Sequence, residues 1–210
     1  MTVARGRFIT FEGGEGCGKT TQIKLLSETL TQRGIAHITT REPGGTPLAE
    51  KIRPLLVEAQ MQVEDWNPLA ETLLFLAARA QHWQQKIEPA LESGQWVLCD
   101  RFMDSTFVYQ GIGKGLGLAF LQQLQHSLGG GAWKPDLTLL LDIDPTQGLE
   151  RAHKRHHNET RFEDLDTHFH QRLREGFLQI ATAEPQRVKV INAALSLSEV
   201  QARINDACFW

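Results

Sequence analysis

Short apolar runs alternate with helical patterns along the chain. Five of these runs predict β-strands, at residues 8–11, 35–39, 96–99, 137–141 and 188–191. The runs at 96–99 and 137–141 are continuously apolar, which is typical of strands buried on both faces. Because strands and helices alternate throughout, the pattern predicts an α/β fold with a parallel sheet.

Several helix starts carry local capping signals. A polar residue followed by proline occurs at Thr46-Pro47, Asn67-Pro68 and Asp144-Pro145, and Ser196 forms a capping box with Glu199. The cap side chain accepts an amide hydrogen that the helix leaves unpaired, and proline fits the first helical position. These signals predict four helices with defined starts.

The longest predicted helix runs from Pro68 to about Ser93 and ends at Gly94. One stripe along it is largely apolar, and its members are Leu69, Leu73, Leu76, Ala80, Trp83 and Ile87. Such a stripe packs into a core or against another subunit. Phe75 and Arg79 lie four residues apart on this helix, so they share a face and could meet one planar ligand.

Length and composition favour a single domain over residues 1–210, because the chain is long enough for one core and contains no linker-like tract. The net charge of −3 argues against a nucleic-acid partner. Cys17, Cys99 and Cys208 fit neither a metal site nor a disulfide framework, and a reducing cytoplasm suits them. No leader or membrane span is predicted.

A complete phosphate-binding loop follows the first predicted strand and precedes a helix that begins near Lys19 and ends at Gly34. Its residues are Gly13, Gly14, Glu15, Gly16, Cys17, Gly18, Lys19 and Thr20, with Thr21 next. The glycines let backbone amides turn towards phosphates, Lys19 reaches a phosphate, and Thr20 reaches Mg²⁺. The chain is therefore predicted to bind a nucleoside triphosphate.

Phosphoryl transfer needs a metal ion and cations around the transferred group. Asp100 ends a predicted strand, where it would hold Mg²⁺ directly or through water, and Arg101 would place a cation in the same crevice. Ordinary charges at a strand end are the alternative for both residues.

Residues 151–161 predict a mobile lid, because cations and histidines dominate the segment and apolar anchors are missing. Arg151, Arg155 and Arg161 are the candidates for an arginine delivered to the transition state. A solvated helix end is the alternative. We disfavour metal binding by His153 and His157, since the neighbouring cations oppose it.

Together these motifs resemble those of the bacterial thymidylate kinases over almost the whole chain. The resemblance is carried by residues 11–21, by residues 41–46 (Arg-Glu-Pro-Gly-Gly-Thr), by Asp100-Arg101 with Ser105 and residues 109–111, and by residues 135–138. It implies a three-layer P-loop kinase fold with a five-stranded parallel sheet, a homodimer, and Mg²⁺-dependent transfer of the γ-phosphate of ATP to dTMP.

The resemblance also implies residue roles. For the base and sugar, Phe75 would stack on thymine, Arg79 would donate to its carbonyl oxygen, and Thr106, Gln110 and Tyr109 would give further contacts. For the rest of dTMP, Glu15 would lie near the 3′-hydroxyl, and Arg53 and Arg101 would hold the phosphate. Lys19, Arg101 and the lid arginines would be catalytic.

Three positions depart from the common family pattern. Gly16 stands where some members carry an arginine, His153 stands where relatives often carry arginine, and Phe102 replaces a tyrosine or histidine. The missing loop cation is expected from the lid arginines.

Alternatives from other classes remain. The nearest is a kinase of the same fold that acts on another nucleoside monophosphate or on a deoxynucleoside. A nucleotide-binding module without catalysis would leave Lys19, Thr20, Asp100 and Arg101 unexplained. A GTPase switch is disfavoured, because the Lys134-x-Asp136 stretch lacks the leading asparagine and precedes a strand.

Overall fold

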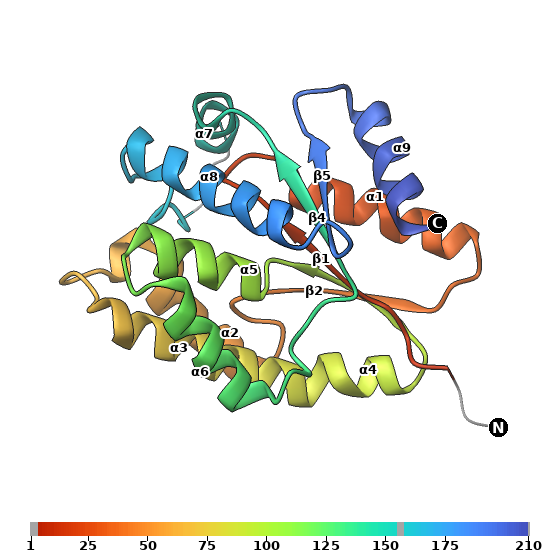
Figure 1. The fold of residues 1–210 in the computed structure, drawn as a ribbon, viewed down its shortest axis with the longest axis horizontal. Coiled ribbons are helices and arrows are strands. Elements are labelled where there is room, and N and C mark those ends of the chain that lie inside the picture. Colours follow the sequence, from red (N-terminus) through yellow and green to blue (C-terminus); the bar gives the residue numbers. More distant parts are fainter. Residues whose placement is uncertain (1–3, 155–157, 210) are drawn as a thin grey trace.

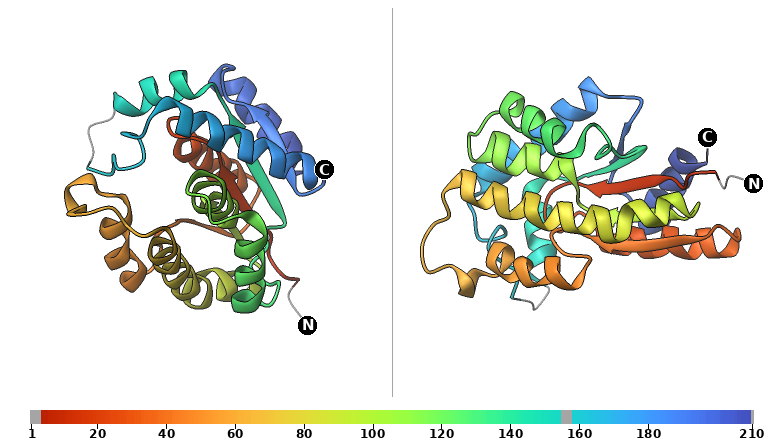
Figure 2. Two further views of the ribbon diagram at one scale, coloured as in Figure 1. Left: turned by 60° about the vertical axis from the view of Figure 1, so that its left-hand side comes forward. Right: turned by 90° about the horizontal axis from the view of Figure 1, so that it is seen from below.

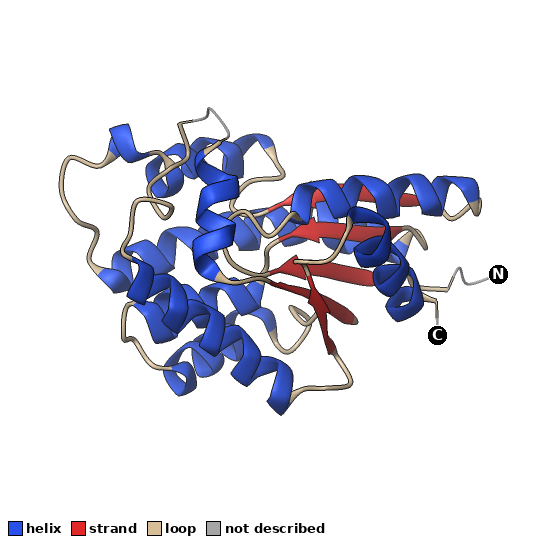
Figure 3. Ribbon diagram, turned by 90° about the horizontal axis from the view of Figure 1, so that it is seen from above, coloured by secondary structure: helices blue, strands red, loops and turns tan. Residues whose placement is uncertain are grey.

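The fold is built on a five-stranded, all-parallel sheet with helices on both faces (Figures 1 and 3). The computed structural model describes residues 4–154 and 158–209. The strands are β1 (Phe8–Glu12), β2 (His37–Arg41), β3 (Trp96–Asp100), β4 (Leu137–Asp142) and β5 (Val188–Asn192). They lie side by side in the order β2-β3-β1-β4-β5. The predicted α/β fold and parallel sheet are confirmed.

The helices of the described residues follow the predicted alternation. They are α1 (Lys19–Gln32), α2 (Pro47–Val57), α3 (Pro68–His82), α4 (Glu88–Glu92), α5 (Met103–Thr106), α6 (Leu118–Gly129), α7 (Pro145–His153), α8 (Thr167–Ala183) and α9 (Leu197–Cys208). Shorter turns are the 3₁₀ turn η1 (Ala59–Met61) and the π-helical turns η2 (Trp83–Ile87) and η3 (Phe107–Gly113). No helix in these described segments is both long and apolar enough to cross a bilayer.

Alternate strand residues face two separate helical layers, one on each side of the sheet (Figure 2). Ile9, Leu98 and Leu139 pack with α1 and α9 on one face. On the other face, Phe8 and Val97 pack with α3 to α6 and the turn η2, and a neighbouring cluster joins β4 and β5 to α8. Both faces of the sheet are therefore buried, which explains why the central strands read as continuous apolar runs.

The four capping signals are confirmed. Thr46, Asn67 and Asp144 each accept an amide hydrogen from the first turn of α2, α3 and α7, and Ser196 with Glu199 forms the capping box of α9. Because caps depend on residues within three positions of one another, the sequence alone reveals them.

The second strand begins two residues later than predicted. The Ile35 amide still donates to the carbonyl of Leu30, so this residue belongs to the turn that closes α1. Pairing with β3 begins only where His37 meets Trp96. The apolar character of Ile35 reflects packing against the α1 and α9 core rather than a place in the sheet.

The long helix is continuous from Pro68 to Glu92, but a π-helical turn interrupts it at Trp83–Ile87. Pro89 lies two residues beyond the end of this turn and has no amide hydrogen to donate to it, which favours such an irregularity. The apolar stripe divides: Leu76, Trp83 and Ile87 are buried, whereas Leu69 and Leu73 are 41% and 50% exposed.

A buried polar network fastens α5 to the sheet below the site. Arg187, which precedes β5, donates from Nη1 and Nη2 to the carboxylate of Asp104 at 2.7 and 2.9 Å. Arg187 also donates to Thr138 Oγ1 at 2.7 Å, and Thr138 contacts Thr10 Oγ1 at 2.9 Å. The side chains of Asp104, Thr138 and Thr10 are at most 3% exposed, and Arg187 is 9% exposed. Losing one partner would leave an uncompensated charge.

We therefore expect Asp104→Ala to lower the free energy of unfolding by about 3–5 kcal/mol, since Arg187 would keep its buried charge without its main partner. Urea denaturation measures this change. Glu184→Ala is the matched control, because Glu184 also binds Arg187 but is 36% exposed, and we expect a loss of about 1 kcal/mol or less. Equal losses in the two variants would contradict the network as described.

Candidate functional site

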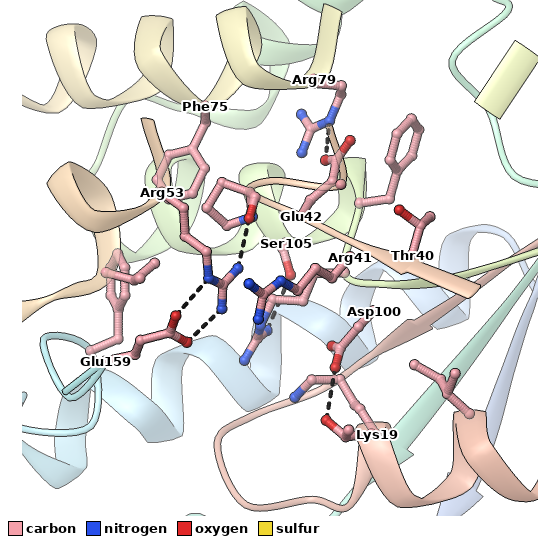
Figure 4. Close-up of a pocket in the computed structure, with 18 of the residues that line it drawn as sticks. Lys19, Thr40, Arg41, Glu42, Arg53, Phe75, Arg79, Asp100, Ser105 and Glu159 are labelled. Carbon is pink, nitrogen blue, oxygen red and sulfur yellow. Dashed lines mark hydrogen bonds and ion pairs between the residues drawn. The ribbon is translucent and has the colours of Figure 1, made fainter. Parts of the chain in front are cut away.

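A cavity of about 930 Å³ opens at the carboxyl ends of β1, β2 and β3. Its walls include the loops that follow these three strands, together with residues of α2, α3 and η3 (Figure 4). Ligands of open parallel sheets bind at this edge, because the strand-to-helix loops converge there. The volume is sufficient for small-molecule ligands of nucleotide size.

The phosphate-binding loop forms one wall of this cavity. Gly18 precedes α1 and has no side chain to cap it, so the first-turn amides of the helix face the cavity without a side-chain acceptor. Lys19 Nζ folds back over the loop and donates to the carbonyls of Gly13 and Gly14 at 3.3 and 3.0 Å. An uncapped helix start with an adjacent lysine is a site for phosphate oxygens.

The loop packs directly against α7 through two glycines. Gly16 has a φ of +66°, and a Cβ built on it would lie 1.8 Å from the carbonyl oxygen of Gly148. A Cβ on Gly148 would in turn lie 2.4 Å from the carbonyl oxygen of Glu15. No side chain fits at position 16 of this chain, so the arginine that the resemblance places there in some family members has no room here.

Cys17 fills space within the loop. Its side chain is 3% exposed, belongs to the core shared by α1 and α9, and lies 3.4 Å from Lys19 Nζ. Cys17, Gly13 and Gly14 contribute backbone to the loop but do not line the large cavity.

Thr20 and Asp100 place two hard oxygen ligands side by side. Thr20 Oγ1 donates to Asp100 Oδ2 at 3.1 Å, and both residues line the cavity. Among the described residues there is no cluster of three or more histidine, cysteine, aspartate or glutamate side chains able to hold a metal ion. A hydroxyl and one carboxylate fit Mg²⁺, which is bound through few protein ligands together with water and phosphate oxygens.

Arg101 joins the phosphate loop to the opposite wall of the cavity. Its Nη1 donates to the Gly13 carbonyl at 3.0 Å and to Ser105 Oγ at 3.2 Å, and its Nη2 donates to Glu15 Oε1 at 2.8 Å. Arg101 has a φ of +65°, an uncommon conformation for a residue with a Cβ. Strained backbone of this kind is concentrated at functional sites.

Glu15 is held as a carboxylate. Burial opposes its ionisation, but the charges of Arg101 and Lys19 and the hydroxyl of Tyr109 outweigh burial and lower the pKa to about 2. Tyr109 donates to Glu15 Oε1 at 2.7 Å, and burial raises the pKa of its own hydroxyl. Glu15 is therefore ionised near pH 7 and can accept a hydrogen bond from a ligand hydroxyl.

Glu12 supports Arg101 from below, a role that the sequence analysis missed. Its carboxylate accepts hydrogen bonds from the amides of Phe102 and Ser105 at 2.8 and 3.3 Å and from Ser105 Oγ at 2.6 Å. Burial and the nearby charge of Asp104 raise the pKa of Glu12. In the sequence, Glu12 belongs to the stretch 11–21 that carries the family resemblance, but no role was inferred for it.

The opposite wall collects the residues that the family resemblance assigned to a nucleoside. Phe75, Arg79, Thr106 and Gln110 all line the cavity. Figure 4 shows Phe75 and Arg79 on α3, across the cavity from Lys19 and Asp100. An aromatic face beside a guanidinium group is suited to a planar ring that carries a carbonyl oxygen.

Arg53 lies between this wall and the phosphate loop. Its Nη1 donates to the Pro43 carbonyl at 2.7 Å, and its Nε and Nη2 form a bidentate pair with Glu159 at 2.7 and 2.6 Å. The bidentate side of the guanidinium, which would also suit a phosphate, is occupied by Glu159 in this structure. Glu159 was another residue that the sequence analysis missed.

The lid arginines are placed differently from one another. Arg151 donates to the Ala193 carbonyl at 3.2 Å, beside the loop after β5. Arg161 donates to the Leu56 carbonyl at 2.8 Å and pairs with the buried carboxylate of Glu71. The segment after the lid thus passes beside the end of α2 (Figure 2). Arg155 lies outside the described residues.

Most of the predicted site residues therefore meet around one cavity. Those that line it are Glu15, Gly16, Gly18, Lys19, Thr20, Thr21, Arg53, Phe75, Arg79, Asp100, Arg101, Thr106, Tyr109 and Gln110. Arg151 and Arg161 are not among its lining residues.

Comparison with known proteins agrees with this geometry. The family model described as thymidylate kinase matches residues 11–204. The chain is 52% identical over 200 residues to a thymidylate kinase of Magnetococcus marinus, covering 95% of this chain and 94% of that protein. It is 46% identical to a thymidylate kinase of Deinococcus radiodurans, covering 96% of each chain.

A solved structure is similar as well. The crystal structure of thymidylate kinase from Ehrlichia chaffeensis superposes with a TM-score of 0.73 at 33% sequence identity, over 96% of this chain and 98% of that chain. The family match over residues 11–204 and the identity to full-length relatives lead to one conclusion: the chain belongs to the thymidylate kinase family.

Proposed function

We propose that this protein is a dTMP kinase, which transfers the γ-phosphate of ATP to dTMP and releases dTDP and ADP. The observation that carries the proposal is that the phosphate loop with Lys19 and the wall with Phe75 and Arg79 face one another across a single cavity. Two nucleotides bound on these two walls would meet with their phosphates in the middle.

On the donor side, we assign the triphosphate to the loop of residues 13–21. The first-turn amides of α1 and Lys19 are placed for the phosphate oxygens. Thr20 and Asp100 would hold Mg²⁺, which neutralises charge on the triphosphate when bound.

On the acceptor side, we assign the base to Phe75, Arg79, Thr106 and Gln110, and the sugar to Glu15 and Tyr109. Arg53 and Arg101 would hold the acceptor phosphate. These guanidinium groups would screen its repulsion against the incoming γ-phosphate, and Arg101 also contacts the donor loop through Gly13.

Further cations for the transition state would come from the lid at residues 151–161. Gly16 leaves no room for a side chain, so the phosphate loop cannot supply that charge beyond Lys19. We keep Arg151, Arg155 and Arg161 as the catalytic candidates. For Arg151 and Arg161 this role requires a movement away from the Ala193 carbonyl and from Glu71.

We further propose one kinase domain over residues 1–210 and a homodimer. Leu69 and Leu73 form an exposed apolar row on α3, and apolar rows of this kind mark association surfaces. The cytoplasmic location expected from the sequence stays a prediction, in keeping with the three buried cysteines, which form no disulfide.

An acceptor screen tests the proposed reaction. With ATP as donor, we expect ADP release to be fastest with dTMP and much slower with dUMP, UMP, AMP, GMP and thymidine. The reason is that the acceptor wall offers hydrogen-bond donors to a thymine carbonyl oxygen, and Arg53 offers a charged group to the acceptor phosphate. A coupled ADP assay measures the ratio of kcat/KM values. Preference for any acceptor other than dTMP would overturn the assignment and favour a related kinase.

Lys19→Ala tests the donor side. We expect kcat to fall by at least about a hundredfold, because a preorganised cation for the transferred phosphate is lost. Circular dichroism should show an unchanged fold, since the hydrogen bonds of Lys19 go only to the loop itself. Near-normal turnover would exclude Lys19 from catalysis.

Gly16→Ala tests the packing of the loop on α7. The added Cβ meets the Gly148 carbonyl and requires an unfavourable φ, so the loop must shift. We expect KM for ATP to rise by about tenfold or more, with KM for dTMP changed much less. Gly14→Ala is the control, because a Cβ there has no atom within 4 Å. Equal effects of the two substitutions would contradict this explanation.

A further inference from the structure

Arg79 is almost fully buried, yet one of its terminal nitrogens is left for a ligand. The side chain is 2% exposed. Its Nε donates to Glu42 Oε2 at 2.6 Å and its Nη1 to Thr106 Oγ1 at 3.0 Å. For Nη2 no hydrogen-bond partner exists among residues 4–154 and 158–209, and the residue lines the cavity beside Phe75. A guanidinium nitrogen of a cavity-lining residue can donate to a ligand bound in that cavity.

Glu42 determines where that free nitrogen points. Its Oε2 holds Arg79 Nε, and its Oε1 accepts from His82 Nδ1 at 3.1 Å. His82 Nε2 in turn contacts Thr40 Oγ1 at 2.7 Å. Glu42 and His82 are 4% and 0% exposed. Both carboxylate oxygens are engaged by α3, one by Arg79 and the other by His82, so the carboxylate has one orientation. The planar guanidinium, held by this carboxylate and by Thr106, has one as well.

The next residue in the chain holds the second arginine of the acceptor wall. The carbonyl of Pro43 accepts from Arg53 Nη1 at 2.7 Å. Two consecutive residues of the loop after β2 therefore anchor Arg79 and Arg53, which lie at the base end and at the phosphate end of the proposed acceptor site. The loop after β2 thus links α3, through Arg79, with α2, through Arg53 (Figure 4).

We propose that Glu42 is the residue that sets base specificity, by orienting Arg79 towards a ring carbonyl oxygen of the acceptor base. This inference rests on the proposed function, in which Arg79 contacts the base. Glu42 is a positioning residue, since it acts through Arg79. A ring that carries an amino group in place of the carbonyl oxygen presents donors to a donor, and the fixed guanidinium rejects it.

The test compares dTMP with dCMP in Glu42→Gln and Glu42→Asp. In Glu42→Gln, we expect KM for dTMP to rise and the preference for dTMP over dCMP in kcat/KM to fall, each by about tenfold, with kcat and KM for ATP nearly unchanged. Glu42→Asp keeps the charge on a shorter side chain. We expect Glu42→Asp to fold and to lose part of the preference for dTMP over dCMP. This variant therefore tests the inference even if Glu42→Gln does not fold.

Glu50→Gln is the matched control. Glu50 supports the same loop through the Gly45 amide at 2.8 Å and pairs with Arg41, but makes no hydrogen bond to Arg79. We expect its dTMP to dCMP ratio to equal that of the wild type. An unchanged ratio in both Glu42 variants, with a lowered melting temperature, would reduce Glu42 to a structural ion pair and overturn the inference. A wild-type protein without preference for dTMP over dCMP would instead refute the proposed function.

Discussion

Arg101 holds the two halves of the cleft at one distance. One guanidinium group binds the phosphate loop through Gly13 and Glu15, and binds the start of α5 through Ser105. Its left-handed backbone conformation is maintained from below by Glu12, which accepts the amides of Phe102 and Ser105. The donor loop and the acceptor wall thus share a rigid connection, and in-line transfer between two bound nucleotides depends on that spacing.

Buried carboxylates organise the rest of the site in the same manner. Glu42 holds Arg79, Glu71 holds Arg161 and Lys114, and Asp104 holds Arg187. Buried ion pairs add little net stability, because desolvation offsets much of their attraction. What they provide here is orientation, since each arginine is left with one arrangement of its donors. A site for two polyanions needs several cations in defined positions. The carboxylates offset the repulsion between these cations and so keep them in place.

The close contact of Gly16 with Gly148 links the phosphate loop to α7, the helix that leads into the predicted lid. At position 16, the loop therefore has a backbone contact with α7 in place of a charged side chain. Under the proposed function, any positive charge beyond that of Lys19 would come from outside the loop. In this chain, a side chain at position 16 would separate the loop from the helix.

Strands, caps and the phosphate loop were predictable, because each depends on residues a few positions apart: the capping of α2, α3, α7 and α9 and the alternation of strand and helix were read correctly. The start of β2 and the π-helical turn before Pro89 were not, since hydrogen bonding to neighbouring elements decides them. The sequence by itself predicted that Arg53, Phe75, Arg79 and Arg101 belong to the site, and all four line the cavity. It did not predict that Arg41 and Phe162 line it as well. Only the tertiary structure decided which carboxylate meets which arginine, as for Glu42 with Arg79 and Glu159 with Arg53, which are 37 and 106 positions apart. Such pairs depend on how α2 and α3 pack on the sheet, and local sequence patterns do not predict this packing.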